Sequence, residues 1–167
     1  ENVTFKHPVV AGSSMGDCIQ FVGYPPAADG TGDKRIRRVM VRNNIFGSCA
    51  RSGIAIHSGL HDSQITGNLF LDIADQDIDE EGTGDIDHIE IDHNVFERGP
   101  SPQSALSVSI YAASNHYLHD NTFNGRGLDL YGCSNCRLQH NRVTLTMPLE
   151  AAVFVRKASH NVQLEDE

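Results

Sequence analysis

A short segment recurs along the chain, and this recurrence constrains the fold more than any other feature. Each copy has an asparagine, an aliphatic residue three positions before it, and a phenylalanine or valine two positions after it. The repeated asparagines are Asn44, Asn68, Asn94, Asn121 and Asn141. They lie 24, 26, 27 and 20 residues apart, which is too uneven for a helical register but is accommodated by turns that accept insertions. Self-similarity of this length indicates a chain that stacks copies of one structural unit.

Apolar and polar residues alternate within each copy, which is the pattern of a short strand. One copy cannot bury its apolar row alone, but stacking on neighbours about 4.8 Å away makes a continuous core of parallel strands. We expect the repeated asparagines to adopt a left-handed backbone and to hydrogen-bond to one another as a ladder. We also expect an inward stack of Phe46, Phe70, Phe96 and Phe123. The other expected inward residues are Val39, Val41, Ile54, Ile56, Ile89, Ile91, Leu106, Val108, Ile110, Leu128, Leu130, Val153 and Val155.

These residues resemble the repeats of the right-handed parallel β-helix proteins, the pectin-lyase-like superfamily. At the start of the chain, Val3 and Phe5 lead to Pro8 in the asparagine position and Val10 in the phenylalanine position. The resemblance implies an all-β, right-handed parallel β-helix of about six coils with an Asn ladder. It implies little about activity, because this fold carries lyases, hydrolases, epimerases, phage tail proteins and adhesins.

The length fits one β-helix domain over residues 1–167. Neither end of the sequence resembles a cap, so we expect a segment of a longer helix. The formal charge of −9 argues against nucleic acid as a partner, and no apolar run approaches a membrane span. The resemblance places the protein outside the cell, at a cell surface or in a virion, and leaves a homo-oligomer open.

The four cysteines suggest structure more than chemistry. Cys133 and Cys136 have a spacing found in metal and redox sites, but no second such pair exists, and Cys18 and Cys49 are isolated in sequence. Since Cys136 falls in the inward column, we expect a buried core thiol.

Outward residues of the second strand set are expected to stack along one face. In the superfamily that the chain resembles, this face and its loops form the cleft for a polysaccharide. The expected substrate-binding residues are Gln20, Tyr111 and Tyr131, because aromatic rings stack on sugar rings and polar groups bond hydroxyls.

An acidic segment gives the sharpest candidate for chemistry. Eight of the 22 acidic residues lie between Asp72 and Asp87, with no Lys or Arg among them. They could bind Ca²⁺, which takes six to eight oxygen ligands, or supply the acid and base of a glycosidase. Calcium could also bridge an acidic polysaccharide for β-elimination, and a solvated edge that blocks aggregation is the structural alternative. The expected calcium ligands are Asp75, Asp77, Asp79 and Glu81.

Glu80 is a misfit because it falls at an inward position, which requires a distorted strand or a buried partner. Among the histidines, His93 and His140 are expected to be exposed turn residues, and His116 to be a buried, hydrogen-bonded one. His57 differs, since it is outward and one coil from Asp79, where it could transfer a proton.

The hypothesis for function is a carbohydrate-active β-helix that binds or cleaves a polysaccharide as a lyase, hydrolase or epimerase. Its expected catalytic residues are Asp79, Glu81, Asp129, His57 and Arg156. The alternative is a non-catalytic structural or adhesive β-helix. Asp-Pro-His, Arg-x-Pro-x-x-Arg and Gly-Asp-Asp motifs of known superfamily enzymes are absent, so no catalytic residue follows by motif.

Overall fold

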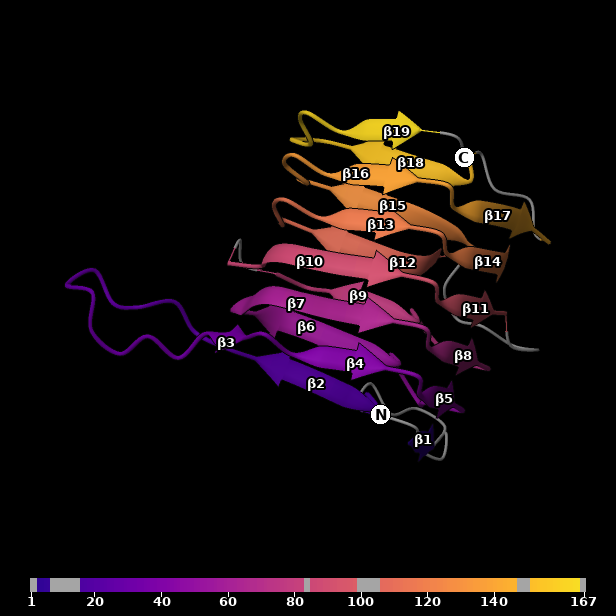
Figure 1. Ribbon diagram of the computed structural model, residues 1–167, viewed down its shortest axis with the longest axis horizontal. Helices are drawn as coiled ribbons and strands as arrows, with labels where there is room; N and C mark the ends of the chain where they lie inside the picture. Colours follow the sequence, from indigo (N-terminus) through magenta and orange to yellow (C-terminus); the bar gives the residue numbers. More distant parts are fainter. Residues whose placement is uncertain (1–2, 7–15, 83–84, 99–105, 147–150, 166–167) are drawn as a thin grey trace.

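The computed structural model describes residues 3–6, 16–82, 85–98, 106–146 and 151–165. These residues form strands, turns and loops, and the strands pair in three parallel sheets. Each coil visits the sheets in the order C, A, B, and the colours of Figure 1 run in sequence along the stack from β1 and β2 to β19. The fold is therefore the expected right-handed parallel β-helix of about six coils.

Sheet A consists of β1 (Thr4–Lys6), β5 (Ile45–Gly47), β8 (Leu69–Leu71), β11 (Val95–Glu97), β14 (Thr122–Gly125) and β17 (Arg142–Leu145). Sheet B consists of β2 (Ile19–Val22), β6 (Ile54–Ser58), β9 (Ile78–Glu80), β12 (Leu106–Tyr111), β15 (Gly127–Tyr131) and β18 (Val153–Arg156). Sheet C consists of β3 (Ile36–Arg37), β4 (Met40–Arg42), β7 (Leu60–Thr66), β10 (Asp87–Asp92), β13 (Tyr117–His119), β16 (Arg137–Gln139) and β19 (Gln163–Glu165). The loop between β2 and β3 extends away from the stack (Figure 1).

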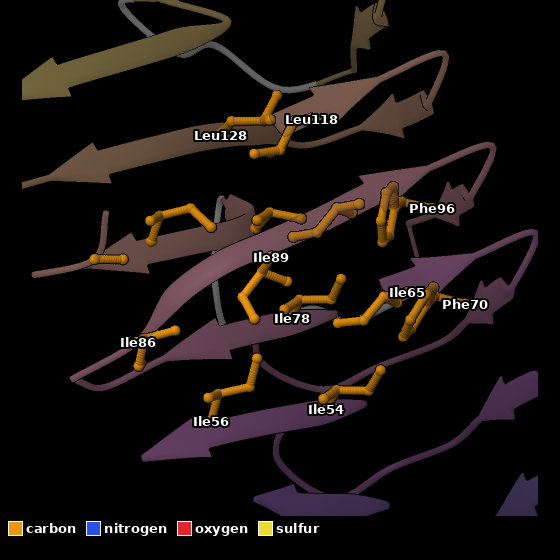
Figure 2. Close-up of a cluster of buried hydrophobic side chains, with 14 of the residues drawn as sticks. Ile54, Ile56, Ile65, Phe70, Ile78, Ile86, Ile89, Phe96, Leu118 and Leu128 are labelled. Carbon is orange, nitrogen blue, oxygen red and sulfur yellow. The ribbon is translucent and has the colours of Figure 1, made fainter. Parts of the chain in front are cut away.

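A column of phenylalanines confirms the expected core. Phe46, Phe70, Phe96 and Phe123 are fully buried, and their rings stack with centroids 4.6, 4.9 and 4.6 Å apart. Figure 2 shows Phe70 and Phe96 beside the isoleucines and leucines of the neighbouring columns. Because each ring meets a copy of itself, one residue type fills the same space in coil after coil.

The repeated asparagines hydrogen-bond from coil to coil. The Nδ2 atoms of Asn44, Asn68, Asn94 and Asn121 each donate to the Oδ1 of the next asparagine, at 3.1, 3.0, 3.0 and 2.9 Å. The same Oδ1 atoms accept a backbone N–H of the preceding coil. These buried amides are thus satisfied by their own repeats.

The left-handed backbone lies one residue earlier than expected. Positive φ angles of 52–62° occur at the residue before each repeated asparagine, in the turn column Asn43, Gly67, His93, Asp120 and His140. The prediction that the asparagine itself bends the chain was wrong. Its side chain instead explains the repeat, because that side chain bonds both a backbone N–H and an amide of the adjacent coil.

Two expected inward positions differ at the ends of the stack. Val155 is 46% exposed because β18 is the edge strand of sheet B. At the other end, Phe5 pairs with Phe46, so Phe5 holds the phenylalanine position that we assigned to Val10. Pro8 and Val10 lie outside the described residues.

Both cysteine pairs form disulfides. Cys18 and Cys49, which are isolated in sequence, are bonded with Cα atoms 5.7 Å apart, and Cys133 is bonded to Cys136. The expected free thiol at Cys136 was therefore wrong, although its burial was correct. Stacking brings Cys18 beside Cys49, a proximity that their separation of 31 residues hides.

Glu80 is buried with a partner, as one of the two expected alternatives required. Its Oε1 lies 3.0 Å from Nε2 of His116, and both side chains are inaccessible to solvent. Desolvation lowers the pKa of His116, but the charge and hydrogen bond of Glu80 and the carbonyl of Ser114 outweigh it, so the pKa is raised. The interior thus holds a polar pair among mainly apolar side chains.

Truncation of the phenylalanine column will destabilise the protein. Phe96→Ala should lower the free energy of unfolding by about 3–5 kcal/mol, because the cavity lies between two stacked rings. Met40→Ala, at a side chain that is 53% exposed, should change it by less than about 0.5 kcal/mol. Urea denaturation measures both, and similar losses for the two variants would contradict this assignment of the core.

The buried pair predicts a pH dependence of stability. A histidine whose pKa is raised on folding stabilises the protein fully below its unfolded pKa, about 6.5, and the contribution is lost as the pH rises through the folded value. The melting temperature should therefore fall above about pH 6.5. The double variant Glu80→Ile/His116→Ile, which inserts the isoleucine of neighbouring coils, should show a smaller fall. Equal slopes in the two proteins would exclude this pair as the source.

Candidate functional site

The outward residues of sheet B form two columns, and the register of the strands fixes their neighbours. The first column contains Gln20, Ala55, Asp79, Ser109, Asp129 and Phe154. The second contains Tyr111, Tyr131 and Arg156, with Glu81 following β9. The sequence therefore placed these candidates correctly on one face.

Asp79 and Glu81 form a carboxyl pair. Their side chains share a hydrogen bond, and Arg51 contacts both, with Nη1 3.5 Å from Oδ2 of Asp79 and hydrogen-bonded to Glu81. Arg51 is itself held by two 2.8 Å bonds to Asp17. Asp17 thus fixes the position of the guanidinium that contacts Asp79 and Glu81.

The two carboxyl groups have pKa values shifted in opposite directions. Burial and the hydrogen bond to Glu81 raise the pKa of Asp79 to about 7. Desolvation opposes ionisation of Glu81, but the hydrogen bonds from Asp79 and Arg51 outweigh it and lower its pKa. Below about pH 7 the pair therefore combines a protonated Asp79 with an ionised Glu81, an arrangement typical of acid–base sites.

His57 extends the site toward β2. Its Nδ1 lies 3.0 Å from Oε2 of Glu81, and its Nε2 lies 2.6 Å from Nε2 of Gln20. Because an amide nitrogen can only donate, Nε2 of His57 accepts, and Nδ1 carries the proton that is donated to Glu81. The expected neighbourhood of His57 and the acidic pair is therefore present.

The turn that carries Arg51 is packed against the core. Gly53 follows it directly before β6, and a Cβ atom there would lie 2.7 Å from the carbonyl oxygen of Asp77 and 2.8 Å from the ring of Phe70. Only glycine fits this approach. The core thereby sets the position from which Arg51 reaches across to the next coil.

An aromatic platform and a hollow adjoin the carboxyl pair. The rings of Tyr111 and Tyr131 stack with centroids 4.8 Å apart and planes 6° apart. A hollow of about 300 Å³ is lined by Asp79, Glu81, Ser109 and Tyr111, together with Glu80. A ligand in this hollow would contact both the acidic pair and the first ring of the platform.

Asp129 lies two strands from Asp79, with Ser109 between them. Strand spacing therefore separates their backbones by about 10 Å. Asp129 Oδ1 lies 2.8 Å from Nε of Arg156 in an ion pair, and the guanidinium of Arg156 also lies over the ring of Phe154. Burial raises the pKa of Asp129, and Arg156 opposes the rise.

The four expected calcium ligands are not one cluster. Asp77 is fully buried in an ion pair with Arg126, at 2.7 Å, and so cannot join Asp79 and Glu81 on the outward face. Within the described part of the chain, the groups of side chains close enough to hold a metal do not include the Asp75–Glu81 segment. Calcium binding by Asp75, Asp79 and Glu81 stays a prediction, and Asp77 is removed from the set.

The Asp77–Arg126 pair yields a test of this correction. Arg126→Met leaves a buried carboxyl without its partner and should cost about 3–5 kcal/mol of stability. The double variant Asp77→Val/Arg126→Met removes both charges and should be clearly more stable than Arg126→Met alone. Chemical denaturation of the wild type and the two variants measures their free energies of unfolding. A double variant no more stable than Arg126→Met would contradict a buried Asp77–Arg126 ion pair.

Sequence reasoning missed Arg51 and Asp17. Both lie in loops, where no periodicity assigns a direction to a side chain. Their neighbours Cys49 and Cys18 are the only local signal, since the disulfide between these cysteines brings the two loops together.

Comparison with known proteins agrees with this architecture. A family model described as a right-handed β-helix region matches residues 29–167. Searches of curated proteins and of solved structures gave no match. The described residues contain no helix long and apolar enough to cross a membrane.

Proposed function

The chain belongs to the right-handed β-helix family, and on this premise we propose that it binds a neutral polysaccharide along sheet B and hydrolyses it, with Asp79 as the general acid. The observation that carries the proposal is the Asp79–Glu81 pair with its opposite pKa shifts. A general acid must hold a proton near neutral pH and release it to the leaving oxygen. Glu81 keeps that proton on Asp79, and Arg51 keeps Glu81 ionised.

Asp129 is the proposed base. Its carboxylate accepts a proton from the water that attacks the anomeric carbon, while Asp79 protonates the glycosidic oxygen as the bond breaks. Inverting glycosidases hold these two groups roughly 6.5–9.5 Å apart, which side chains on backbones about 10 Å apart can reach. Asp79 and Glu81, which bond each other directly, leave no room for a sugar or water between them. The geometry therefore favours an inverting reaction across Ser109.

The rest of the face suits sugar binding. Tyr111 and Tyr131 offer stacked rings for sugar faces, and Gln20, His57 and Arg156 offer polar contacts to hydroxyl groups. Arg51 and Arg156 are already paired with carboxylates, and the chain carries a formal charge of −9. A uronate polymer would therefore meet repulsion, which supports a neutral substrate.

The two disulfides support an oxidising, extracellular location, where a polysaccharide substrate is encountered. This location is part of the proposal.

A panel of neutral and acidic polysaccharides, assayed for reducing ends and unsaturated products, tests the reaction. Asp79→Asn and Asp129→Asn should each lower kcat about 10²–10⁴-fold, because each removes an acid or a base. Asp62→Asn, an exposed acid of sheet C, is the matched control and should retain activity. The rate should fall as the pH rises through about 7, where Asp79 loses its proton.

Tyr111→Ala should raise KM about tenfold with little change in kcat, because the ring contacts substrate away from the reacting bond. Release of unsaturated ends would instead indicate a lyase. Saturable binding without any product would indicate the adhesive alternative, and full activity of both aspartate variants would refute the assignment of acid and base.

A further inference from the structure

A second polar cluster lies on sheet C, apart from the proposed catalytic face. It arises from the turn column, where His93, Asp120 and His140 occupy equivalent positions with φ of 53, 52 and 53°. Successive coils stack about 4.8 Å apart, so Asp120 lies between two imidazoles. His119 is the adjacent residue on β13, with its ring 5.9 Å from that of His93.

His119 faces carboxylates with both ring nitrogens. Its Nδ1 lies 2.8 Å from Asp120, and its Nε2 lies 2.9 Å from Glu90. A neutral imidazole has only one N–H, so it can satisfy only one of these acceptors. The second contact requires a further positive charge, which is either a proton or a metal ion.

The surrounding side chains hold the cluster in position. Gln64 Nε2 donates to Glu90 and to Asp92, at 3.2 and 3.1 Å, and Thr66 donates to Asp92 at 2.8 Å. The ring of Tyr117 stacks on His119 at 4.1 Å. Such outer contacts orient metal ligands and fix their rings.

We propose that His93, His119 and Asp120 bind a Zn²⁺ ion. One ligand atom from each of the three lies within 4.8 Å of the others. Two imidazoles and one carboxylate suit zinc, whereas calcium prefers oxygen ligands alone. A second set, Glu90, Asp92 and His119, satisfies the same distance, and Glu90 contacts the other ring nitrogen of His119, which holds the imidazole in place. His93 is largely exposed, so water can complete the coordination.

Zinc and protons compete for His119. Zinc binds the unprotonated imidazole, so its affinity should fall in acid. The titratable and charged side chains around the ring are Glu90, Asp92, His93, Tyr117, Asp120, Arg137 and His140.

Isothermal titration of the EDTA-treated protein with zinc chloride at pH 7.5 tests the proposal. We expect saturable binding of one ion, with no comparable heat from calcium chloride. His119→Gln and His93→Gln should each weaken zinc binding at least tenfold. His88→Gln, which alters an exposed histidine of β10 outside the cluster, should change the zinc affinity by less than twofold. At pH 5.5 the wild-type affinity should fall at least tenfold.

Thermal melting of each variant verifies that it is folded. If His119→Gln does not fold, His93→Gln still tests the site, because His93 is exposed and its replacement should not disturb the core. Absence of saturable heat overturns the proposal. So does an equal loss in His88→Gln, which would indicate adventitious binding to surface histidines.

Discussion

Parallel, in-register pairing of successive coils places every side chain about 4.8 Å from its counterpart in the next coil. A residue is therefore selected for its fit to its own column as well as to its own coil. Phenylalanine satisfies this requirement by stacking on phenylalanine, and asparagine by donating its amide to the asparagine beyond it. The apolar interior and the buried hydrogen bonds both follow from the same spacing.

The spacing also restricts charge, because like charges at that distance repel. On sheet B, Asp79 lies between Ala55 and Ser109, and Asp129 lies between Ser109 and Phe154. Carboxyl groups are thus interleaved with uncharged side chains along the column. On sheet B, another charged side chain comes close to Asp79 only from the second column, as Glu81 does, or from a loop, as Arg51 does. On sheet C the alternation is of acid with imidazole.

The columns were predictable from sequence, because a period of strands and turns assigns each residue a direction. This logic correctly put Asp79, Asp129, Tyr111 and Tyr131 on one face. The same logic does not apply to loops, because the repeat pattern assigns no direction to the side chains of loop residues such as Arg51.

Pairing across the interior was also hidden from the sequence. Glu80 and His116 were each placed inward, but their contact depends on how sheets B and C face each other. Asp77 falls within the acidic segment, but its partner Arg126 comes from another coil, so the sequence pattern could not distinguish this buried ion pair from a calcium ligand.

The left-handed backbone of the turns has an energetic consequence for the stack. Among the described residues, fourteen other than glycine have positive φ angles. That backbone costs an L-residue roughly 1–2 kcal/mol and is rarely adopted outside glycine, asparagine and aspartate. Many of these residues donate a backbone N–H to the next coil, as Asn43 does to Thr66 and His93 to His119, and an isolated coil would lose these bonds. The strained backbone of a coil is therefore stable only when the coils on both sides are present. One repeat alone is unstable, and the contacts between repeats supply most of the stability. Such a solenoid should unfold over many coils at once rather than fray one repeat at a time.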